Sequence, residues 1–369
     1  MNKTKKVLLT IVVLLLFTML GLNIYLILNK EIVQTTNITK TEKEVTITDQ
    51  GIAEAVDKLY DATVIVELTS DDSVTGWGSG FVYKADDKYA YIITNYHVTE
   101  DNKKVTIEYT NGTTTEGTVI GGDEYTDVSV VRVDKNTIIK VAEISDNSSN
   151  VKLGDTVFAI GTPVSMKFKF TVTRGILSGR DRLMQMSNQN TTSLFARTNA
   201  NIESWYINLL QIDASINSGN SGGPLANANG EVIGITNSKL ASSAIENIGF
   251  AVPIEDVKNV AEQVISNGEV SRPYVGVGLT SVANAIRTGL IKETDEEGIV
   301  VGTIEDDSAA KHAGLKEGDI ITKFGDYDIT TVEYFKYYLN RYKPGDKITI
   351  TYIRDGKSNT TELTLGKKS

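Results

Sequence analysis

The 369-residue chain contains no cysteine and only two histidines. The lack of cysteine excludes disulfide bonds, thiolate nucleophiles, cysteine-ligated zinc and lipid attached to a cysteine. Because His97 and His312 are the only imidazoles, any mechanism that needs a histidine base must use one of them. The formal net charge of −10 argues against a nucleic-acid partner, since phosphate binding requires a basic surface. We expect no metal site and no cofactor.

Residues 7–28 form a long run without a charged side chain. As an α-helix this run spans about 33 Å, which matches the hydrocarbon core of a bilayer. Lysines precede it at positions 3, 5 and 6, so the positive-inside rule keeps residues 1–6 in the cytoplasm. A cleaved signal peptide is the alternative, but the run is longer than usual and no alanine precedes Ala53. We expect an uncleaved cell-membrane anchor, a polar stalk at 29–51, and the remaining chain on the extracytoplasmic side.

Short runs rich in β-branched and aromatic residues dominate residues 52–253. The clearest of them lie at 63–68, 80–83, 89–94, 105–109 and 128–133. Asn-Gly pairs at 111–112 and 229–230 predict tight hairpins. Many short strands with turn signals between them indicate an all-β barrel or sandwich. The polar stretch 180–206 departs from this pattern and is interpreted as a long loop.

A helix and a second, smaller unit follow this region. Residues 254–272 contain apolar side chains at helical spacing, which predicts a helix that links the two parts. Residues 273–369 combine short strands with helices near 308–313 and 331–342 and end in a hairpin that turns at 355–356. This part is therefore predicted to be α+β.

The glycine-rich turn around Ser221 is the strongest chemical signal in the sequence. A serine that attacks a carbonyl needs backbone N–H groups aimed at the developing oxyanion, and a tight glycine-containing turn supplies them. Gly219 and Ser221 are the natural donors. An ordinary Gly/Ser/Asn loop is the competing interpretation, since these residues dominate turns.

His97 and Asp127 complete a candidate triad. His97 follows an apolar strand and is the only histidine before residue 312, so Ser221 has no other candidate base in its domain. Asp127 precedes an apolar strand, where a partly buried carboxylate can orient an imidazole through its Nδ1 hydrogen. Asp123 and Asp155 are alternatives for this role. The order His, Asp, Ser is that of chymotrypsin-type double barrels.

These features resemble the HtrA/Deg family of membrane-anchored serine proteases. The matching segments are GSGF at 78–81, TN at 94–95, HV at 97–98, DV at 127–128, AIG at 159–161, TVT at 171–173, GNSGGP at 219–224, GEVIGI at 230–235 and IGFAVP at 248–253. The resemblance implies a mainly β protein with a chymotrypsin-like double β-barrel protease domain at 52–253. It also implies that His97, Asp127 and Ser221 are catalytic and that the amides of Gly219 and Ser221 form the oxyanion hole.

The C-terminal part, 273–369, resembles the PDZ domain of the same family, with AGLKEGDII at 313–321 as a second matching segment. The resemblance implies that Tyr274, Val275, Gly276 and Val277 form the loop that binds a peptide's C-terminal carboxylate, while the peptide adds a strand to the sheet. It also implies a homotrimer. His312 is interpreted as a surface residue of this domain, without metal partners.

The function expected from these features is hydrolysis of misfolded or regulatory proteins, including unfolded and membrane proteins, outside the membrane. Whether this serves general protein quality control and the stress response or one signalling substrate is left open. A protein-binding chaperone or scaffold with incidental proteolysis is the alternative from another class. At the primary specificity pocket, Ser215 occupies the position where trypsin-like enzymes have an aspartate. Together with Ile216 and Ile235 it predicts cleavage after modest aliphatic residues, mainly Val, Ala, Ile and Leu, with Asp213 as the one residue that could reverse this preference.

Overall fold

The computed structural model describes residues 15–22, 24–25, 49–70, 73–100, 102–187, 204–238 and 247–367. The chain divides into two compact units, Met1–Thr46 and Ile47–Ser369. In the first unit, 15–22 and 24–25 are helical, and none of the helices formed by described residues is long and apolar enough to cross a bilayer. Most of the predicted anchor at 7–28, and the predicted stalk up to residue 48, lie outside the described residues.

The first six strands of the second unit close into a barrel in the order β1-β2-β3-β6-β5-β4. All of its strand pairs are antiparallel. The strands are β1 (Thr63–Ser70), β2 (Ser73–Ala85), β3 (Tyr89–Thr94), β4 (Lys104–Tyr109), β5 (Thr114–Asp123) and β6 (Val128–Asp134). The runs at 63–68, 80–83, 89–94, 105–109 and 128–133 all lie inside these strands, so those strand predictions are confirmed.

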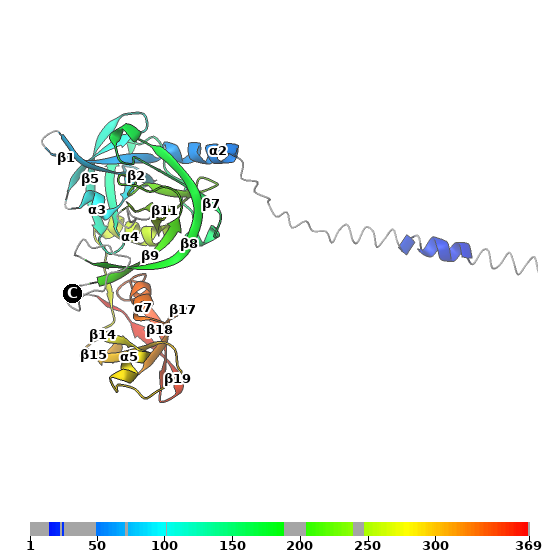
Figure 1. The fold of residues 1–369 in the computed structure, drawn as a ribbon, viewed down its shortest axis with the longest axis vertical. Coiled ribbons are helices and arrows are strands. Elements are labelled where there is room, and N and C mark those ends of the chain that lie inside the picture. The colour runs from blue at the N-terminus through cyan, green and yellow to red at the C-terminus, as the bar shows by residue number, and fades with distance from the viewer. Residues whose placement is uncertain are drawn as a thin grey trace, which may run out of the picture. The chain divides into compact units, whose positions relative to one another are not determined.

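The next six strands close a second barrel in the order β10-β11-β12-β9-β8-β7, drawn in green in Figure 1. They are β7 (Thr156–Gly161), β8 (Thr171–Ser187), β9 (Ser204–Ile212), β10 (Pro224–Asn227), β11 (Val232–Thr236) and β12 (Gly249–Pro253). Short 3-10 turns lie at η1 (Lys135–Thr137), η2 (Ser148–Asn150) and η3 (Met166–Phe168). The prediction of a mainly β, chymotrypsin-like double barrel is confirmed.

The prediction of an irregular loop at 180–206 is wrong at both ends. β8 continues to Ser187 and pairs with β9 from Ser204 onward, so residues 180–187 and 204–206 form an antiparallel ribbon. The charged run Arg180-Asp181-Arg182 at its start hid this ribbon, although Met186 and Trp205 within it are buried in the core. The central residues, 188–203, lie outside the described part.

Two helices pack on the barrels and share one core with them. α2 (Asp49–Tyr60) precedes β1 and contributes Leu59, and α4 (Ile254–Asn267) follows β12 and contributes Val257 and Val264. These side chains lie in the same buried cluster as Phe81 of the first barrel and Phe158 of the second. α4 starts directly after Pro253 and ends at Gly268, whose left-handed conformation terminates the helix. The predicted linker helix therefore packs on the two barrels.

The last hundred residues form an α+β domain with its own core around Phe324 and Phe335. Its main sheet has the order β14-β15-β16-β18-β19 with β17 paired to β16, and β13 pairs with β20. The elements are β13 (Pro273–Tyr274), β14 (Val277–Ser281), α5 (Val282–Arg287), β15 (Ile299–Ile304), α6 (Ala309–His312), β16 (Ile320–Phe324), β17 (Tyr327–Asp328), α7 (Val332–Leu339), β18 (Lys347–Arg354), β19 (Lys357–Thr364) and β20 (Gly366–Lys367). The predicted helices near 308–313 and 331–342, and the hairpin at 355–356, are confirmed.

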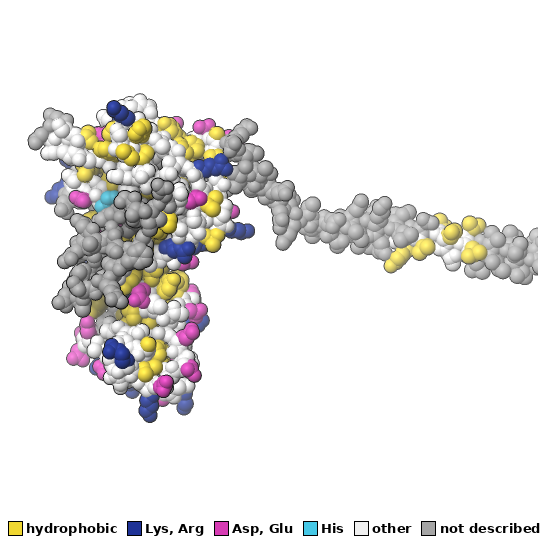
Figure 2. Space-filling model, viewed as in Figure 1, with side chains coloured by type: hydrophobic (Ala, Val, Ile, Leu, Met, Phe, Trp, Pro, Cys, Tyr) yellow, Lys and Arg dark blue, Asp and Glu magenta, His cyan; other side chains and the backbone are white. Residues whose placement is uncertain are grey.

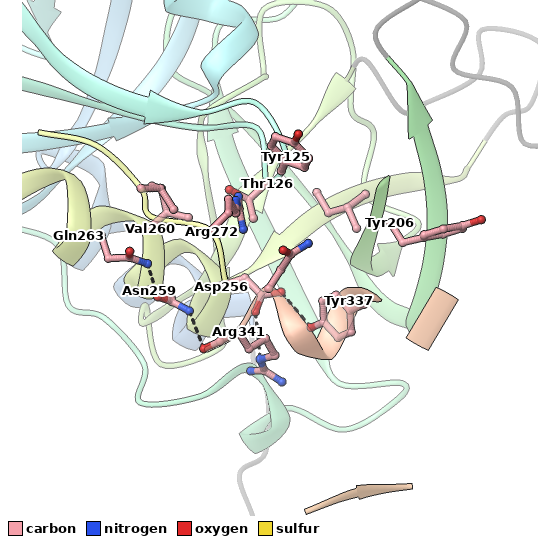
Figure 3. Close-up of a pocket in the computed structure, with 13 residues that line it drawn as sticks. Tyr125, Thr126, Tyr206, Asp256, Asn259, Val260, Gln263, Arg272, Tyr337 and Arg341 are labelled. Carbon is pink, nitrogen blue, oxygen red and sulfur yellow. Dashed lines mark hydrogen bonds and ion pairs between the residues drawn. The ribbon is translucent and has the colours of Figure 1, made fainter. Parts of the chain in front are cut away.

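A polar network joins α7 to α4, as Figure 3 shows. Asp256 on α4 is buried, and its carboxylate accepts a hydrogen bond of 3.0 Å from the Tyr337 hydroxyl. The guanidinium of Arg341 lies 3.4 Å from the same carboxylate, and the Arg341 carbonyl accepts a 3.1 Å bond from the Asn259 amide. Burial nevertheless raises the pKa of Asp256 to about 6, because removing a carboxylate from water disfavours its charged form.

Candidate active site

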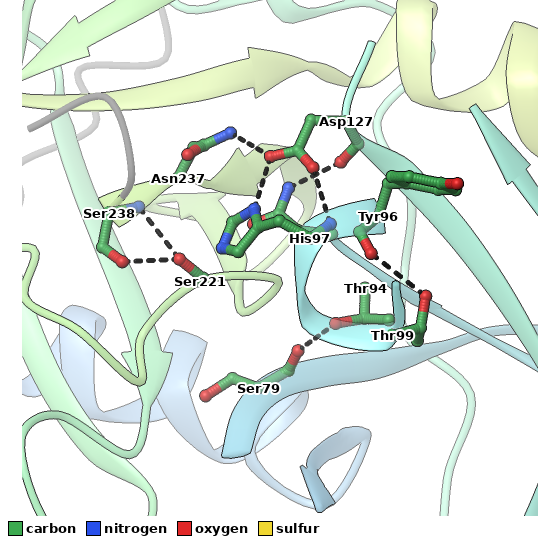
Figure 4. A network of polar contacts seen from close by, with 10 residues as sticks. Ser79, Thr94, Tyr96, His97, Thr99, Asp127, Ser221, Asn237 and Ser238 are labelled. Atoms are coloured by element: carbon green, nitrogen blue, oxygen red, sulfur yellow. Dashed lines mark hydrogen bonds and ion pairs between the residues drawn. The ribbon is translucent and has the colours of Figure 1, made fainter. Parts of the chain in front are cut away.

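The three residues of the predicted triad come from the junction between the two barrels. His97 lies in the single turn of α3 (Tyr96–Thr99), directly after β3, and Asp127 lies in the turn that leads into β6. Both therefore belong to the first barrel. Ser221 lies in the turn before β10 of the second barrel. The sequence separates these residues widely, and closure of both barrels brings them to one place (Figure 4).

Asp127 holds His97 by two hydrogen bonds. The His97 Nδ1 atom lies 2.7 Å from Asp127 Oδ2, and the His97 backbone N–H donates to Oδ1 at 2.9 Å. Since an ionised carboxylate only accepts, the Nδ1 atom carries the hydrogen of this bond. The Asp127 carbonyl accepts bonds from the Asn95 side-chain amide and the Tyr96 N–H, which fix its left-handed backbone at φ 55°. The other ring nitrogen, Nε2, is left for a reacting partner.

A third group, Asn237, binds the same carboxylate. Its side-chain amide donates to Asp127 Oδ2 at 2.7 Å, and Asn237 itself is fully buried. The Asp127 carboxylate thus has hydrogen-bond donors from two barrels, because Asn237 directly follows β11. The sequence analysis missed this residue, since an asparagine after a strand is a common turn residue and gives no local signal.

The Ser221 hydroxyl is bonded to Ser238. The two Oγ atoms lie 2.6 Å apart, and the Ser238 backbone N–H donates to Ser221 Oγ at 3.1 Å. Within the described residues these are the hydrogen bonds of that hydroxyl. Figure 4 shows the His97 ring between Asp127 and Ser221. The Ser221 hydroxyl, which the sequence predicts as the nucleophile, therefore forms a hydrogen bond with the Ser238 hydroxyl, and either oxygen can be the donor.

The backbone of the glycine turn leaves two amides available. Gly219 adopts φ 96°, and a side chain there would collide with the carbonyl oxygen of Thr162, at 2.1 Å from an added Cβ. The Gly222 N–H is bound by the Thr236 carbonyl and the Asn220 N–H by the Asn217 carbonyl. No described residue accepts a hydrogen bond from the N–H of Gly219 or Ser221. These are the two amides that the sequence predicts as oxyanion donors.

The alternative carboxylates are occupied elsewhere. Asp123 accepts bonds from the N–H and hydroxyl of Thr126 and pairs with Arg272, while Asp155 accepts the Lys152 N–H at 2.7 Å in a local turn. Neither is bonded to His97. Asp213 accepts the N–H of Ile176 on β8 at 2.6 Å, so its carboxylate is bound to that strand.

The segment before the nucleophile fits the predicted small pocket. Ser215 is exposed, whereas Ile216 is buried and Ile235 lies in the core. Ile216 packs against Gly249 at the start of β12, where an added Cβ would lie 2.8 Å from its Cγ1. Ile216 therefore lies in the core of the second barrel, and the carboxylate of Asp213, two residues before Ser215, is bonded to β8.

The remaining histidine lies apart from this site. His312 is at the end of α6 with 69% of its side chain exposed, and its Nε2 is 3.3 Å from Asp307 Oδ1. Among the described residues, no three His, Cys, Asp or Glu side chains are grouped closely enough to hold a metal ion.

The predicted carboxylate-binding loop of the C-terminal domain has a defined backbone. Tyr274 ends β13, Val277 begins β14, and Gly276 between them adopts φ 75°. The carbonyls of Val275 and Gly276 accept bonds of 3.0 Å from Ala310 and Glu305. In a trans peptide the N–H points opposite to the carbonyl, so the N–H groups of Gly276 and Val277 point away from those partners. Such an arrangement can receive an anion.

Comparison with known proteins identifies the same two domains. Residues 78–235 match the family of trypsin-like peptidase domains, and residues 273–365 match the PDZ domain family. The chain is 38% identical over 298 residues to the serine protease Do-like HtrB of Bacillus subtilis, covering 79% of this chain and 62% of that protein. It is 36% identical over 301 residues to the serine protease Do-like HtrA of Lactococcus lactis, covering 79% of this chain and 71% of that protein.

A solved structure described as the HtrA-type protease AlgW with tripeptide is 28% identical, with a TM-score of 0.65. The match covers 86% of this chain and 97% of that one. The chain is thus a trypsin-like peptidase domain joined to a PDZ domain. It belongs to the HtrA family of serine proteases, although it spans less than two thirds of the length of Bacillus subtilis HtrB.

Proposed function

We propose that this chain is a serine endopeptidase that hydrolyses misfolded or regulatory proteins through an acyl-enzyme. The observation that best supports this proposal is the arrangement of His97 and Ser221. Asp127 holds the His97 imidazole, and the N–H groups of Gly219 and Ser221 in the serine's turn donate to no described residue. Ser221 Oγ attacks the scissile carbonyl, and His97 Nε2 takes its proton and passes it to the leaving amine. The negative oxygen of the tetrahedral intermediate is stabilised by the N–H groups of Gly219 and Ser221. Water then hydrolyses the acyl-enzyme by the same steps.

The proposal requires that the Ser221 hydroxyl leave Ser238 and meet His97. A serine side chain changes rotamer without moving the backbone, so this exchange costs little more than one hydrogen bond, about 1 kcal/mol. We infer that substrate binding, or ordering of neighbouring loops, makes the exchange. No observation favours the alternative of a scaffold with incidental proteolysis.

The decisive experiment is removal of the nucleophile from the purified full-length chain in detergent. Ser221→Ala is expected to abolish cleavage of casein while the thermal unfolding midpoint stays within a few degrees, because the change removes one oxygen. His97→Ala is expected to lose as much activity, since triad residues act as a unit and their losses do not add. Near wild-type cleavage by Ser221→Ala would overturn the proposal.

We further propose that the protein is anchored in the cell membrane by residues 7–28, with both domains outside. Within this segment the described residues 15–22 and 24–25 are helical, and their large apolar side chains are 50–68% exposed, as the yellow atoms of Figure 2 show. Exposed apolar helix surface of this kind needs an apolar environment. We also propose that the chain forms a homotrimer. The loop of the PDZ domain is proposed to bind peptide C-termini through Tyr274, Val275, Gly276 and Val277. Carbonate-resistant membrane association that is lost on deletion of 7–28 tests the anchor.

A further inference from the structure

Asn95 occupies the N-cap position of α3, the single turn that carries His97, but its side chain does not cap that turn. An asparagine at this position usually accepts a hydrogen bond through Oδ1 from an N–H group of the first helical turn. The Oδ1 atom of Asn95 is buried and accepts no hydrogen bond from a described residue. Its side-chain amide instead donates to the backbone carbonyl of Asp127 at 2.8 Å. The side chain of Asn95 therefore binds Asp127 and does not stabilise its own helix.

Asp127 contacts α3 with its backbone and its side chain at once. Its carbonyl accepts the Asn95 amide and the Tyr96 N–H, while its carboxylate accepts the Nδ1–H and the backbone N–H of His97. These four bonds accompany a left-handed backbone with φ 55°, which residues other than glycine rarely adopt. A change to the right-handed conformation would rotate the carbonyl relative to the Cα–Cβ bond. The carbonyl and the carboxylate could then not both keep their partners on α3.

The Asn95 amide makes its bond from a fixed position in the first barrel. Asn95 is fully buried and directly follows β3, whose last residue, Thr94, pairs with Ser129 near the start of β6. α3 has only four residues, and a helix this short is not stable by itself, so its N–H groups cannot fix Asp127 alone. The bond from Asn95 therefore anchors the Asp127 carbonyl to the paired strands of the barrel.

We propose that Asn95 is a positioning residue for the peptidase reaction: by holding the Asp127 carbonyl, it keeps the Asp127 carboxylate on both N–H groups of His97. The carboxylate in turn keeps the imidazole in the tautomer with hydrogen on Nδ1, so that Nε2 is free to accept the proton of Ser221. This inference rests on the proposed function. Among the described residues, Asn95 is hydrogen-bonded to neither His97 nor Ser221, so its effect passes through Asp127.

Asn95→Ala tests the inference, because alanine lacks the amide that holds the Asp127 carbonyl. A displacement of about 1 Å in a catalytic group costs about 100-fold, and a loss of this size in kcat is expected for a fluorogenic peptide with an aliphatic residue before the scissile bond. The Tyr96 N–H still binds the carbonyl in this variant, so the loss should stay below the roughly 10⁴-fold that a wrong tautomer causes. KM is expected to change less than about threefold, since Asn95 is buried away from the substrate.

The tautomer of His97 gives a readout that does not depend on turnover. The chain has only two histidines, so selective ¹⁵N labelling of histidine gives NMR signals from two rings. The signals of the exposed His312 are assigned by their absence in His312→Gln and serve as the internal reference. At alkaline pH, where imidazoles are neutral, the wild-type His97 ring is expected to carry its hydrogen on Nδ1. In Asn95→Ala a mixture of the two tautomers is expected, with the His312 signals unchanged.

Thr99→Val is the matched control. Thr99 is buried in the same turn, and its hydroxyl is bonded to the Tyr96 carbonyl and the Ser129 hydroxyl but not to Asp127. Valine keeps the shape of threonine and loses these bonds, so the thermal unfolding midpoint should fall about as far as in Asn95→Ala. The kcat and the His97 tautomer should nevertheless stay at their wild-type values, because Asp127 keeps all of its partners.

If Asn95→Ala does not fold, Asn95→Leu, which keeps a branched side chain of at least the same volume, is measured in its place. A folded variant of Asn95 that keeps kcat within threefold of Thr99→Val would overturn the inference. Loss of kcat with an unchanged tautomer would overturn it as well, since the effect would not pass through the imidazole. Failure of both variants to fold would assign Asn95 a structural role and would also overturn it. A wild-type chain as inactive as Ser221→Ala would instead overturn the proposed function, while the tautomer shift in Asn95→Ala would still be found.

Discussion

Single side chains around Ser221 carry information that the sequence pattern does not. His97, Asp127 and Ser221 could be predicted, because histidine is scarce and a glycine turn with a serine has few uses. Asn237 and Ser238 could not, since each contacts the proposed triad from a residue that is distant in the chain. Asn237 reaches Asp127 only after β11 and β6 have joined their separate barrels. Residue types that are common in turns are brought into contact with the proposed triad here by tertiary structure alone.

Ser238 is expected to lower activity, because its hydroxyl forms a hydrogen bond with the Ser221 hydroxyl that must be broken before Ser221 can react. Its hydroxyl contributes one of the two hydrogen bonds that hold Ser221 Oγ, and the other comes from the backbone. A neutral hydrogen bond is worth about 0.5–1.5 kcal/mol, so Ser238→Ala should raise kcat roughly 2- to 10-fold. Ser238→Thr, which keeps a hydroxyl, is the control and should behave like wild type. A drop in kcat for Ser238→Ala would mean that Ser238 assists the reaction.

Among the secondary-structure elements, the strands of both barrels followed from β-branched runs and Asn-Gly turns, whereas the β8–β9 ribbon did not. Residues 182–187 pair with β9, but the charged run Arg180-Asp181-Arg182 and a register shift before Arg182 confine the alternation of apolar and polar side chains to 184–187. The interruption of the pattern hid the ribbon and not a lack of burial, since the paired residues Met186 and Trp205 both lie in the buried core cluster. The helix α2 was not predicted, although Ile52, Ala55 and Leu59 recur at helical spacing and are all buried.

The start of β12 determines the width of the predicted specificity pocket. Ile216 packs on Gly249, so the pocket beside Ser215 should accept small aliphatic side chains and discriminate among them by only about 1–3 kcal/mol per methylene. Ile216→Ala removes part of this filling and should shift cleavage toward larger residues such as Phe and Leu. Mapping of casein cleavage sites by mass spectrometry, for wild type and variant side by side, measures the shift. A majority of wild-type cuts after Lys or Arg would contradict the pocket assignment.

At the scale of the whole molecule, the buried carboxylate of Asp256 links α4 to the C-terminal domain, and its pKa is raised. Arg341, Tyr337, Glu255 and Arg272 all influence Asp256, and burial outweighs the attraction of the arginines. The folded-state pKa of about 6 lies above the ordinary value of 3.8. The contribution of Asp256 to stability is therefore fully present below about pH 4 and is lost as the pH rises through about 6. A difference of roughly two units corresponds to about 3 kcal/mol.

Asp256→Asn should remove this pH dependence, because an amide is neutral at all relevant pH values and still accepts the Tyr337 hydrogen bond. The variant is expected to match wild type near pH 4 and to be more stable at pH 7.5, by up to about 3 kcal/mol in denaturant titrations. Asp328→Asn, at an exposed carboxylate, is the control and should leave the wild-type pH profile unchanged. A variant that is less stable than wild type at pH 7.5 would show that the pairing with Arg341 outweighs burial.

The division of the site between the barrels has a consequence for the newly made chain. The first barrel is complete by Asp134, and it contains the base and the carboxylate that orients it. Ser221 and its glycine turn come later in the chain, so a nascent polypeptide can bury the first barrel long before the three residues of the proposed triad can meet. Translation order thus delays activity until about residue 253, by which point β12 has closed the second barrel. A protease divided in this way stays inert during synthesis until both barrels are complete.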